Sequence, residues 1–280
     1  MERFGIFGFP ITHSLSPVMH TASFRSLGLD AEYIAFEVTP EALACKLKAC
    51  QAEGFCGLNM TIPHKTAVIP LIDRVDPVAA LAGAVNTVRF DADGKTSGFN
   101  TDIGGFLTDL KESCGCAPEG KRILLVGCGG AGRAIALGCV RAGAATVFLA
   151  NRTEARAHEV AALLKPVATR TAVEVLPSDP AHWCSAARTC DVIINGTSAG
   201  LHAEDVSPLP AAAFCPNQVV YDLVYSPTRS TPFLRCAWAQ GARGVDGLGM
   251  LIHQGAEAFR LWTGRDADIA AMRAAVWKEK

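Results

Sequence analysis

The sequence contains no apolar run long enough to cross a membrane. A transmembrane helix needs roughly 20 consecutive apolar residues, and no stretch of this 280-residue chain approaches that length. The opening segment, MERFGIFGFP, has one arginine, a short apolar patch and an early proline. This pattern is typical of an opening strand rather than a secretion signal, so we expect a cytoplasmic protein with no membrane partner.

An excess of one charge sign is also missing. The chain has 26 Lys and Arg residues against 27 Asp and Glu residues, and neither sign forms a long run. A broad surface for nucleic acid or anionic lipid needs an excess of positive charge. We therefore expect no nucleic-acid partner, and an acidic ligand must be held by a local site.

Metal-ligand spacing and a disulfide framework are absent as well. The 11 cysteines are odd in number and lie singly in apolar segments, as reduced thiols do in the cores of cytosolic enzymes. The tightest pair is Cys114 and Cys116, and His182 lies near Cys184. Neither group has zinc-type spacing with enough partners, so no metal site is predicted.

What the sequence does contain is a regular alternation of apolar runs and helical patterns. Half of the residues are hydrophobic and 19% are charged, so a large core can form and disorder is excluded. In the first part of the chain the pattern predicts strands over 3–9, 31–38, 54–62 and 85–90, with helices near 17–27 and 40–52. In the second part it predicts strands over 122–127, 145–150, 191–197 and 218–225, then helices near 248–262 and 266–277.

This order predicts two α/β domains, each with a mainly parallel sheet. The apolar runs are continuous, as in strands that are covered on both faces. A hairpin is expected at Asp93-Gly94, and the Pro/Gly-containing segment 116–121 separates the two domains. The chain is expected to return to the first domain through 241–249, which gives the boundaries 1–104 with 247–280, and 105–246.

A glycine-rich motif indicates a dinucleotide site in the second domain. The segment from Gly127 to Gly132, GCGGAG, fits G-x-G-x-x-G directly after a strand and at the start of a helix. In that context backbone N–H groups can approach a pyrophosphate at the helix N-terminus. The alternative is a Gly-rich turn in an ordinary βαβ unit.

The carboxylate that NAD sites use is missing from the end of the next strand. NAD sites usually place Asp or Glu there to bind the ribose 2′-hydroxyl, whereas this chain has Asn151, Arg152 and Thr153, followed by Arg156. Arg152 and Arg156 are four residues apart at a helix start, so we expect both on one helix face, and guanidinium groups can bind a 2′-phosphate in bidentate fashion. NADP(H) is therefore the expected cofactor, and an S-adenosylmethionine methyltransferase is disfavoured. The alternative is that both arginines are solvated residues at a helix start.

Polar clusters follow three strand ends in the first domain. They are HSLSP at 13–17, Asn59 and Thr61 ahead of Pro-His-Lys65, and Asn-Thr-Asp at 100–102, with Asn86 nearby in VNTV. Ligands of open α/β sheets bind outside the carboxyl ends of the strands. The clusters therefore predict a pocket for a small hydroxylated ligand, with one lysine and one aspartate.

Each cluster also has a purely structural interpretation. Ser16 before Pro17 resembles a helix N-cap, Thr101-Asp102 resembles a cap followed by a helix-start acid, and Asn59 and Asn86 fit buried amides. Lys65 is harder to explain in this way, because an ammonium in the first turn of a helix opposes the helix dipole.

In their order along the chain, these segments resemble the shikimate dehydrogenase family. The matching motifs are HSLSP (13–17), NMTIPHK (59–65), AGAVNT (82–87), NTD (100–102), GCGGAGRA (127–134), NRT (151–153), NGTSAG (195–200), VYDLVY (220–225), TPFL (231–234) and DGLGMLIHQGAEAF (246–259). The resemblance covers the whole chain. It implies an NADP-dependent oxidoreductase that interconverts 3-dehydroshikimate and shikimate in aromatic amino acid biosynthesis, with a substrate-binding first domain and a Rossmann-type second domain.

The resemblance also implies a role for each matching residue. Lys65 and Asp102 match the catalytic pair, and Ser14 and Ser16 match the serines that hold the substrate carboxylate. The other substrate-site residues match those that bond the ring hydroxyls or line the pocket: Asn59, Thr61, Asn86, Asp102, Gln254 and Tyr225. The cofactor-site residues are Gly127, Gly129, Gly130, Ala131, Gly132, Asn151, Arg152, Thr153, Arg156, Thr197 and Gly247.

The implied reaction is a reversible hydride transfer to the ring carbonyl of 3-dehydroshikimate. The Lys65 ammonium would stabilise the charge on the carbonyl oxygen and donate the proton, while Asp102 orients it. Both serines are present, which favours shikimate over quinate. A quinate or quinate/shikimate dehydrogenase and a non-catalytic NADP-binding regulatory protein are the two alternatives. A monomer and a homodimer are both compatible with the sequence.

Overall fold

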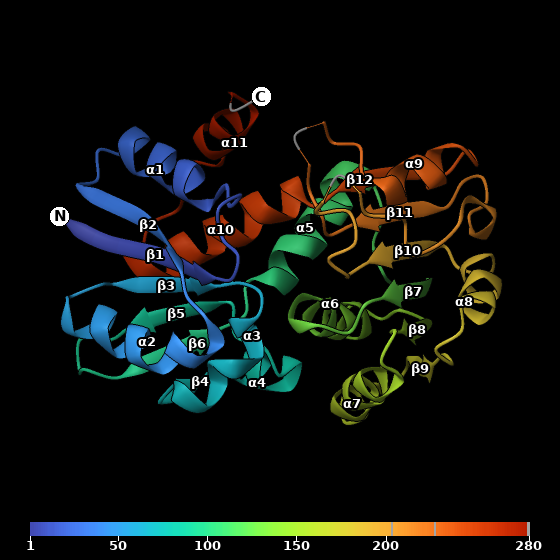
Figure 1. Ribbon diagram of the computed structural model, residues 1–280, viewed down its shortest axis with the longest axis horizontal. Coiled ribbons are helices and arrows are strands. Elements are labelled where there is room, and N and C mark those ends of the chain that lie inside the picture. Colours follow the sequence, from blue (N-terminus) through green and yellow to red (C-terminus); the bar gives the residue numbers. More distant parts are fainter. Residues whose placement is uncertain (203, 227, 279–280) are drawn as a thin grey trace. The chain divides into compact units, whose positions relative to one another are not determined.

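The computed structural model describes residues 1–202, 204–226 and 228–278, and it divides into two compact α/β units (Figure 1). The first unit contains residues 1–105 together with the described residues from 251 onward, and the second contains residues 106–250. Each unit has one six-stranded sheet, so the predicted fold class is confirmed.

The sheet of the first unit is mainly parallel. Its strands are β1 (Glu2–Gly8), β2 (Ala31–Glu37), β3 (Gly57–Met60), β4 (Arg74–Val75), β5 (Thr87–Phe90) and β6 (Thr96–Phe99), in the order β2-β1-β3-β5-β6-β4. Strand β1 pairs in parallel with β2 and β3, and β4 pairs in parallel with β6. The predicted hairpin forms between β5 and β6, and β5 also pairs antiparallel with β3.

Helices cover both faces of this sheet. They are α1 (Ser16–Ser26), α2 (Leu43–Ala52), α3 (His64–Ala67), α4 (Pro77–Ala82), the start of α5 (Asp102–Cys114), α10 (Leu248–Thr263) from residue 251, and α11 (Ile269–Lys278). On one face Phe4 of β1 stacks against Phe24 of α1 and Trp262 of α10. On the other face Phe7 of the same strand packs in a cluster with Leu43 and Leu47 of α2. Burial on both faces explains the continuous apolar runs in the sequence.

The sheet of the second unit is entirely parallel. Its strands are β7 (Arg122–Val126), β8 (Thr146–Ala150), β9 (Ala172–Val175), β10 (Val192–Asn195), β11 (Val219–Asp222) and β12 (Arg243–Asp246), in the order β12-β11-β10-β7-β8-β9. The chain reverses its direction of travel across the sheet between β7 and β10. The carboxyl ends of these two strands are therefore the topological switch point at which doubly wound folds bind ligands.

Two strands of this sheet were not predicted. β9 and β12 lie at its two edges, where short sequences such as AVEV and RGVD carry charged residues and lack a continuous apolar run. The segment 241–249, through which the chain is expected to return to the first domain, contains β12, because residues 243–246 pair with β11 as an edge strand.

The remaining helices of the second unit are the rest of α5 from residue 106, α6 (Gly130–Arg141), α7 (Glu154–Leu164), α8 (Pro180–Ala187) and α9 (Pro232–Trp238). Its core is built from the strands β7, β10 and β11, with Leu124, Ile193 and Val220 fully buried. None of the helices in the described part of the chain has both the length and the apolar character of a membrane span.

Candidate active site

Lys65 and Asp102 form an ion pair in the first unit. Lys65 lies in the short helix α3 and Asp102 is the first residue of α5, and the Lys65 Nζ donates to Asp102 Oδ2 at 2.6 Å. The side chains are only 13% and 4% exposed. Asp102 thus supplies the negative charge that offsets the placement of Lys65 in a first helical turn.

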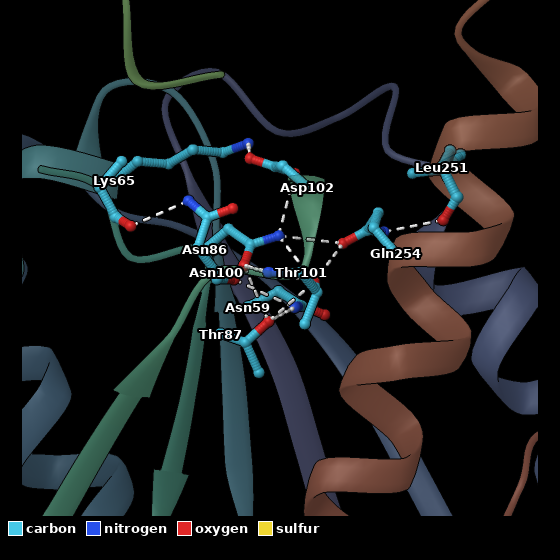
Figure 2. A network of polar contacts seen from close by, with 10 residues as sticks. Asn59, Lys65, Asn86, Thr87, Asn100, Thr101, Asp102, Leu251 and Gln254 are labelled. Carbon is cyan, nitrogen blue, oxygen red and sulfur yellow. Dashed lines mark hydrogen bonds and ion pairs between the residues drawn. The ribbon is translucent and has the colours of Figure 1, made fainter. Parts of the chain in front are cut away.

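Asn86 links this pair to the rest of the cluster (Figure 2). Its Nδ2 donates to Asp102 Oδ1 at 2.9 Å, and its Oδ1 accepts from the backbone N–H of Thr101 at 2.8 Å. Gln254 approaches from α10, and its Oε1 lies 3.2 Å from the Asn86 Nδ2. Four segments distant in the sequence therefore meet at one group of side chains, as predicted for strand ends that converge at one edge of a sheet.

Asn59 is held by the protein on all sides. Its Oδ1 accepts from the Tyr33 hydroxyl at 2.6 Å, and its Nδ2 donates to the Asn86 backbone oxygen and to Thr87 Oγ1, both at 3.1 Å. Asn59 and Asn86 are buried amides, so this structural interpretation holds for both. Because both amide hydrogens of Asn59 are committed, only its oxygen has capacity left for a ligand.

The two serines lie between the end of β1 and the first turn of α1. Ser14 Oγ accepts from the Ser16 backbone N–H at 3.3 Å, and Ser16 is buried. The interpretation of Ser16 as the N-cap is wrong: the helix begins at Ser16, and Leu15, which cannot accept a capping hydrogen bond through its side chain, occupies the cap position.

Thr61 and Tyr225, two further predicted substrate-site residues, belong to different units. Thr61 follows β3, and its backbone N–H donates to the Phe7 oxygen at 2.9 Å, which holds it beside the end of β1. Tyr225 belongs to the second unit, three residues after β11.

The glycine-rich loop of the second unit leads from β7 into α6. Gly127 has a φ of +104°, and a Cβ there would lie 2.6 Å from the Gly196 carbonyl carbon. A Cβ on Gly132 would lie 1.9 Å from the Gly127 oxygen. Beside Gly129, in contrast, nothing lies within 4 Å of the position of a Cβ. The loop is therefore tight on its protein side and open at the N-terminus of α6, which fits a pyrophosphate there.

Asn151, directly after β8, is hydrogen-bonded to the glycine-rich loop. Its Oδ1 accepts from the Cys128 backbone N–H at 3.0 Å, and its Nδ2 donates to the Thr153 oxygen at 2.8 Å. The neighbouring Arg152 and Arg156 are exposed, and within the described residues their guanidinium groups make no ion pair. The expectation that both lie on one helix face is wrong, because α7 begins at Glu154 and Arg152 precedes it.

Thr197 and Gly247 follow the strands β10 and β12. The Thr197 hydroxyl donates to Asn195 Oδ1 at 2.7 Å, and the Gly247 N–H donates to the Val224 oxygen at 3.2 Å. Asn195 also donates to the fully buried Asp222 at 2.8 Å. Burial raises the pKa of Asp222 to about 7, opposed by hydrogen bonds from Thr231, Val224 and Asn195. A protonatable carboxyl therefore anchors the loops at these strand ends.

Within the described part of the chain, no group of three His, Cys, Asp or Glu side chains is arranged to hold a metal ion. All 11 cysteines are free thiols.

Family models match both units. The shikimate dehydrogenase substrate binding domain matches residues 6–88, shikimate / quinate 5-dehydrogenase matches residues 110–213, and the shikimate 5'-dehydrogenase C-terminal domain matches residues 247–276. A shikimate dehydrogenase (NADP(+)) of Moorella thermoacetica is 46% identical over 268 residues, which cover 95% of this chain and 90% of the relative. The chain belongs to the shikimate dehydrogenase family. The resemblance drawn from the motifs is thereby confirmed.

Solved structures of the shikimate dehydrogenase family agree with this fold along the whole chain. The enzyme of Thermus thermophilus in complex with NADP(H) and shikimate is 40% identical, with a TM-score of 0.88 and 100% of both chains covered. Quinate dehydrogenase from Corynebacterium glutamicum in complex with NAD is 33% identical, also with a TM-score of 0.88, and 99% of each chain is covered. The fold is thus shared by members that differ in substrate and in cofactor.

Sequence reasoning missed two side chains of the polar cluster, Tyr33 and Thr87. Tyr33 lies in the middle of an apolar strand, where an aromatic residue is typical of core packing, and its partner Asn59 is 26 residues away. Thr87 was treated as part of a strand. The signal that was present in the sequence was the run of polar residues Asn86-Thr87 inside a buried segment.

Proposed function

We propose that this protein is an NADP-dependent shikimate dehydrogenase, which catalyses the reversible reduction of 3-dehydroshikimate to shikimate. The observation that carries this proposal is the buried Lys65–Asp102 ion pair at 2.6 Å, set among neutral hydrogen-bonding side chains. Full-length similarity to the NADP-dependent members supports the same reaction.

In this proposal the first unit binds the substrate. Ser14 and Ser16 hold the carboxylate, and Thr61, Asn86, Asp102 and Gln254 bond the ring hydroxyls. Asn59 contributes through its oxygen alone. Tyr225 matches a tyrosine that lines the substrate pocket in the shikimate dehydrogenase family. The corresponding domain boundaries are 1–104 with 247–280 for substrate binding and catalysis, and 105–246 for the cofactor.

In the same proposal NADP(H) is held by the second unit. The open face of the glycine-rich loop, Gly127 to Gly132, leaves space for the pyrophosphate, and the exposed guanidinium groups of Arg152 and Arg156 suit a 2′-phosphate. Asn151, Thr153, Thr197 and Gly247 complete the site. When bound, the cofactor supplies or accepts the hydride.

Lys65 is proposed as the acid and base of the reaction. Its ammonium stabilises the negative charge that builds on the carbonyl oxygen, and it gives that oxygen a proton from Nζ. Asp102 holds the ammonium in place through Oδ2, and Asn86 holds Asp102 through Oδ1. Oxidation of shikimate runs through the same groups in reverse, with Lys65 accepting the hydroxyl proton.

A quinate dehydrogenase is the second candidate, and the similarity to the enzyme of Corynebacterium glutamicum favours it. The experiment is a steady-state comparison of shikimate and quinate, each paired with NADP and with NAD, followed by the absorbance of the reduced cofactor. Turnover that is fastest with shikimate and NADP supports the proposal, and faster turnover with quinate supports the second candidate. NADP binding without turnover of either acid indicates a regulatory protein.

A further inference from the structure

Tyr33 donates a hydrogen bond to Asn59 of the proposed substrate site and is only 6% exposed. Its ring stacks on His20 of α1, with ring centroids 4.4 Å apart and planes 4° apart. His20 in turn is fully buried and contacts Trp262 of α10 at 5.6 Å between ring centroids. This packing on two helices fixes the Tyr33 ring, and with it the position of the hydroxyl.

The Tyr33 hydroxyl has a single proton, and that proton is donated to Asn59 Oδ1 at 2.6 Å. Burial raises the pKa of Tyr33 well above its ordinary value, so the hydroxyl remains a donor throughout the physiological range. A fixed donor on one side of an amide decides which way the amide points. Tyr33 therefore directs the two hydrogens of Asn59 away from itself.

From Asn59 the hydrogen bonds continue toward the ion pair. Asn59 Nδ2 donates to Thr87 Oγ1 at 3.1 Å, and Thr87 Oγ1 donates to Asn86 Oδ1 at 3.1 Å. Asn86 Nδ2 then donates to Asp102 Oδ1 at 2.9 Å. Each donor along this chain of side chains points toward Asp102, and hydrogen bonds with a common direction strengthen one another.

We propose that Tyr33 is a positioning residue of this site: its hydroxyl orients Asn59 and, through Thr87, the Asn86 amide that contacts Asp102. This inference rests on the proposed function, because it assigns Tyr33 to the reaction of Lys65 and Asp102. The Thr101 backbone N–H also holds Asn86 Oδ1, at 2.8 Å. Loss of the Tyr33 hydroxyl should therefore weaken the arrangement without abolishing it.

The test is a double-mutant cycle on kcat/KM for shikimate, with Tyr33→Phe, Thr87→Val and the double variant. Each single change removes one hydroxyl and keeps the shape of the side chain. We expect each to lower kcat/KM by roughly three- to tenfold, in line with the loss of one buried hydrogen bond. Both changes break the same chain of hydrogen bonds. The kcat/KM of the double variant should therefore be no more than about twofold below that of the less active single variant.

Tyr221→Phe is the matched control. This residue is the other buried tyrosine, it lies in the second unit, and its hydroxyl donates to Asp109 rather than to the network. Tyr221→Phe should lower thermal stability and leave kcat/KM for shikimate within about twofold of wild type. In the double variant Tyr221→Phe with Thr87→Val, the fold-loss of kcat/KM should equal the product of the losses in the two single variants. The KM for NADP should stay constant in Tyr33→Phe and in Thr87→Val.

The outcomes separate this inference from the proposed function. Wild-type kcat/KM in Tyr33→Phe, or losses by Tyr33→Phe and Thr87→Val that multiply fully, would overturn the positioning role while the wild-type activity stands. If Tyr33→Phe does not fold, Thr87→Val alone decides, since wild-type kcat/KM in that variant also overturns the role. A wild-type protein that is inactive with both shikimate and quinate overturns both the inference and the proposed function.

Discussion

The buried carboxyl of Asp222 should make the stability of the protein depend on pH in an unusual direction. Asp222 Oδ1 accepts from Asn195 Nδ2 and the Val224 N–H, and Oδ2 accepts from Thr231 Oγ1 at 2.6 Å. Burial nevertheless dominates and raises the pKa of Asp222 from 3.8 to about 7. The folded state therefore holds this proton more tightly than the unfolded chain does.

The size of the effect follows from the difference between the two pKa values. A shift of about three units at about 1.4 kcal/mol per unit corresponds to about 4 kcal/mol. Because the folded-state pKa is the higher one, this stabilisation is complete below pH 3.8. It is lost as the pH rises through about 7, so the contribution of Asp222 falls where those of most carboxylates rise.

Asp222→Asn tests this reasoning, because an amide resembles the protonated acid and does not titrate. The free energy of unfolding of Asp222→Asn and of wild type, measured in urea, should be similar near pH 4, close to the unfolded-state pKa of 3.8. By pH 8 the variant should be the more stable protein by up to about 4 kcal/mol. Glu174→Gln, a change on the exposed edge strand β9, is the control and should show no such divergence. A difference between Asp222→Asn and wild type that is constant from pH 4 to pH 8 would refute the reasoning.

Three further predictions concern the proposed site. Lys65→Ala should lower kcat by on the order of a hundredfold or more with a smaller change in the KM for shikimate, and a raised KM with unchanged kcat would remove Lys65 from catalysis. Ser14→Ala should raise the KM for shikimate by roughly ten- to hundredfold, the usual range for a hydrogen bond to a charged group; a KM within about twofold of wild type would contradict the carboxylate assignment. Wild type should prefer NADP over NAD by at least about a hundredfold in kcat/KM, and Arg152→Ala with Arg156→Ala should lose most of that preference. A double variant that still strongly prefers NADP would show that the two guanidinium groups are only surface charges.

The fold was largely predictable because its central strands are buried on both faces. β1 and β7, for example, appear in the sequence as continuous apolar runs, and this property does not depend on distant partners. β9 and β12 were missed for the opposite reason. Each is an edge strand of four residues with one face partly exposed, so its identity is decided by pairing with β8 or β11 and not by its own composition.

The ion pair of the candidate site was predictable, whereas its supporting contacts were not. Lys65 and Asp102 each follow a strand, and the convergence of strand ends brings them together whatever the details of the loops. The capping role expected for Ser16 and the shared helix face expected for Arg152 and Arg156 depended on where a helix begins, and a shift of one or two residues made both wrong. Tyr33 could not be found from its strand, because only the folded sheet places Asn59 beside its hydroxyl.

Reaction of the purified wild-type protein with shikimate and NADP decides whether the proposed activity is present. We expect formation of NADPH together with an equal amount of 3-dehydroshikimate, identified by mass spectrometry, and much slower formation of NADPH with quinate. Absence of turnover with shikimate in the presence of either NADP or NAD would contradict the proposed function.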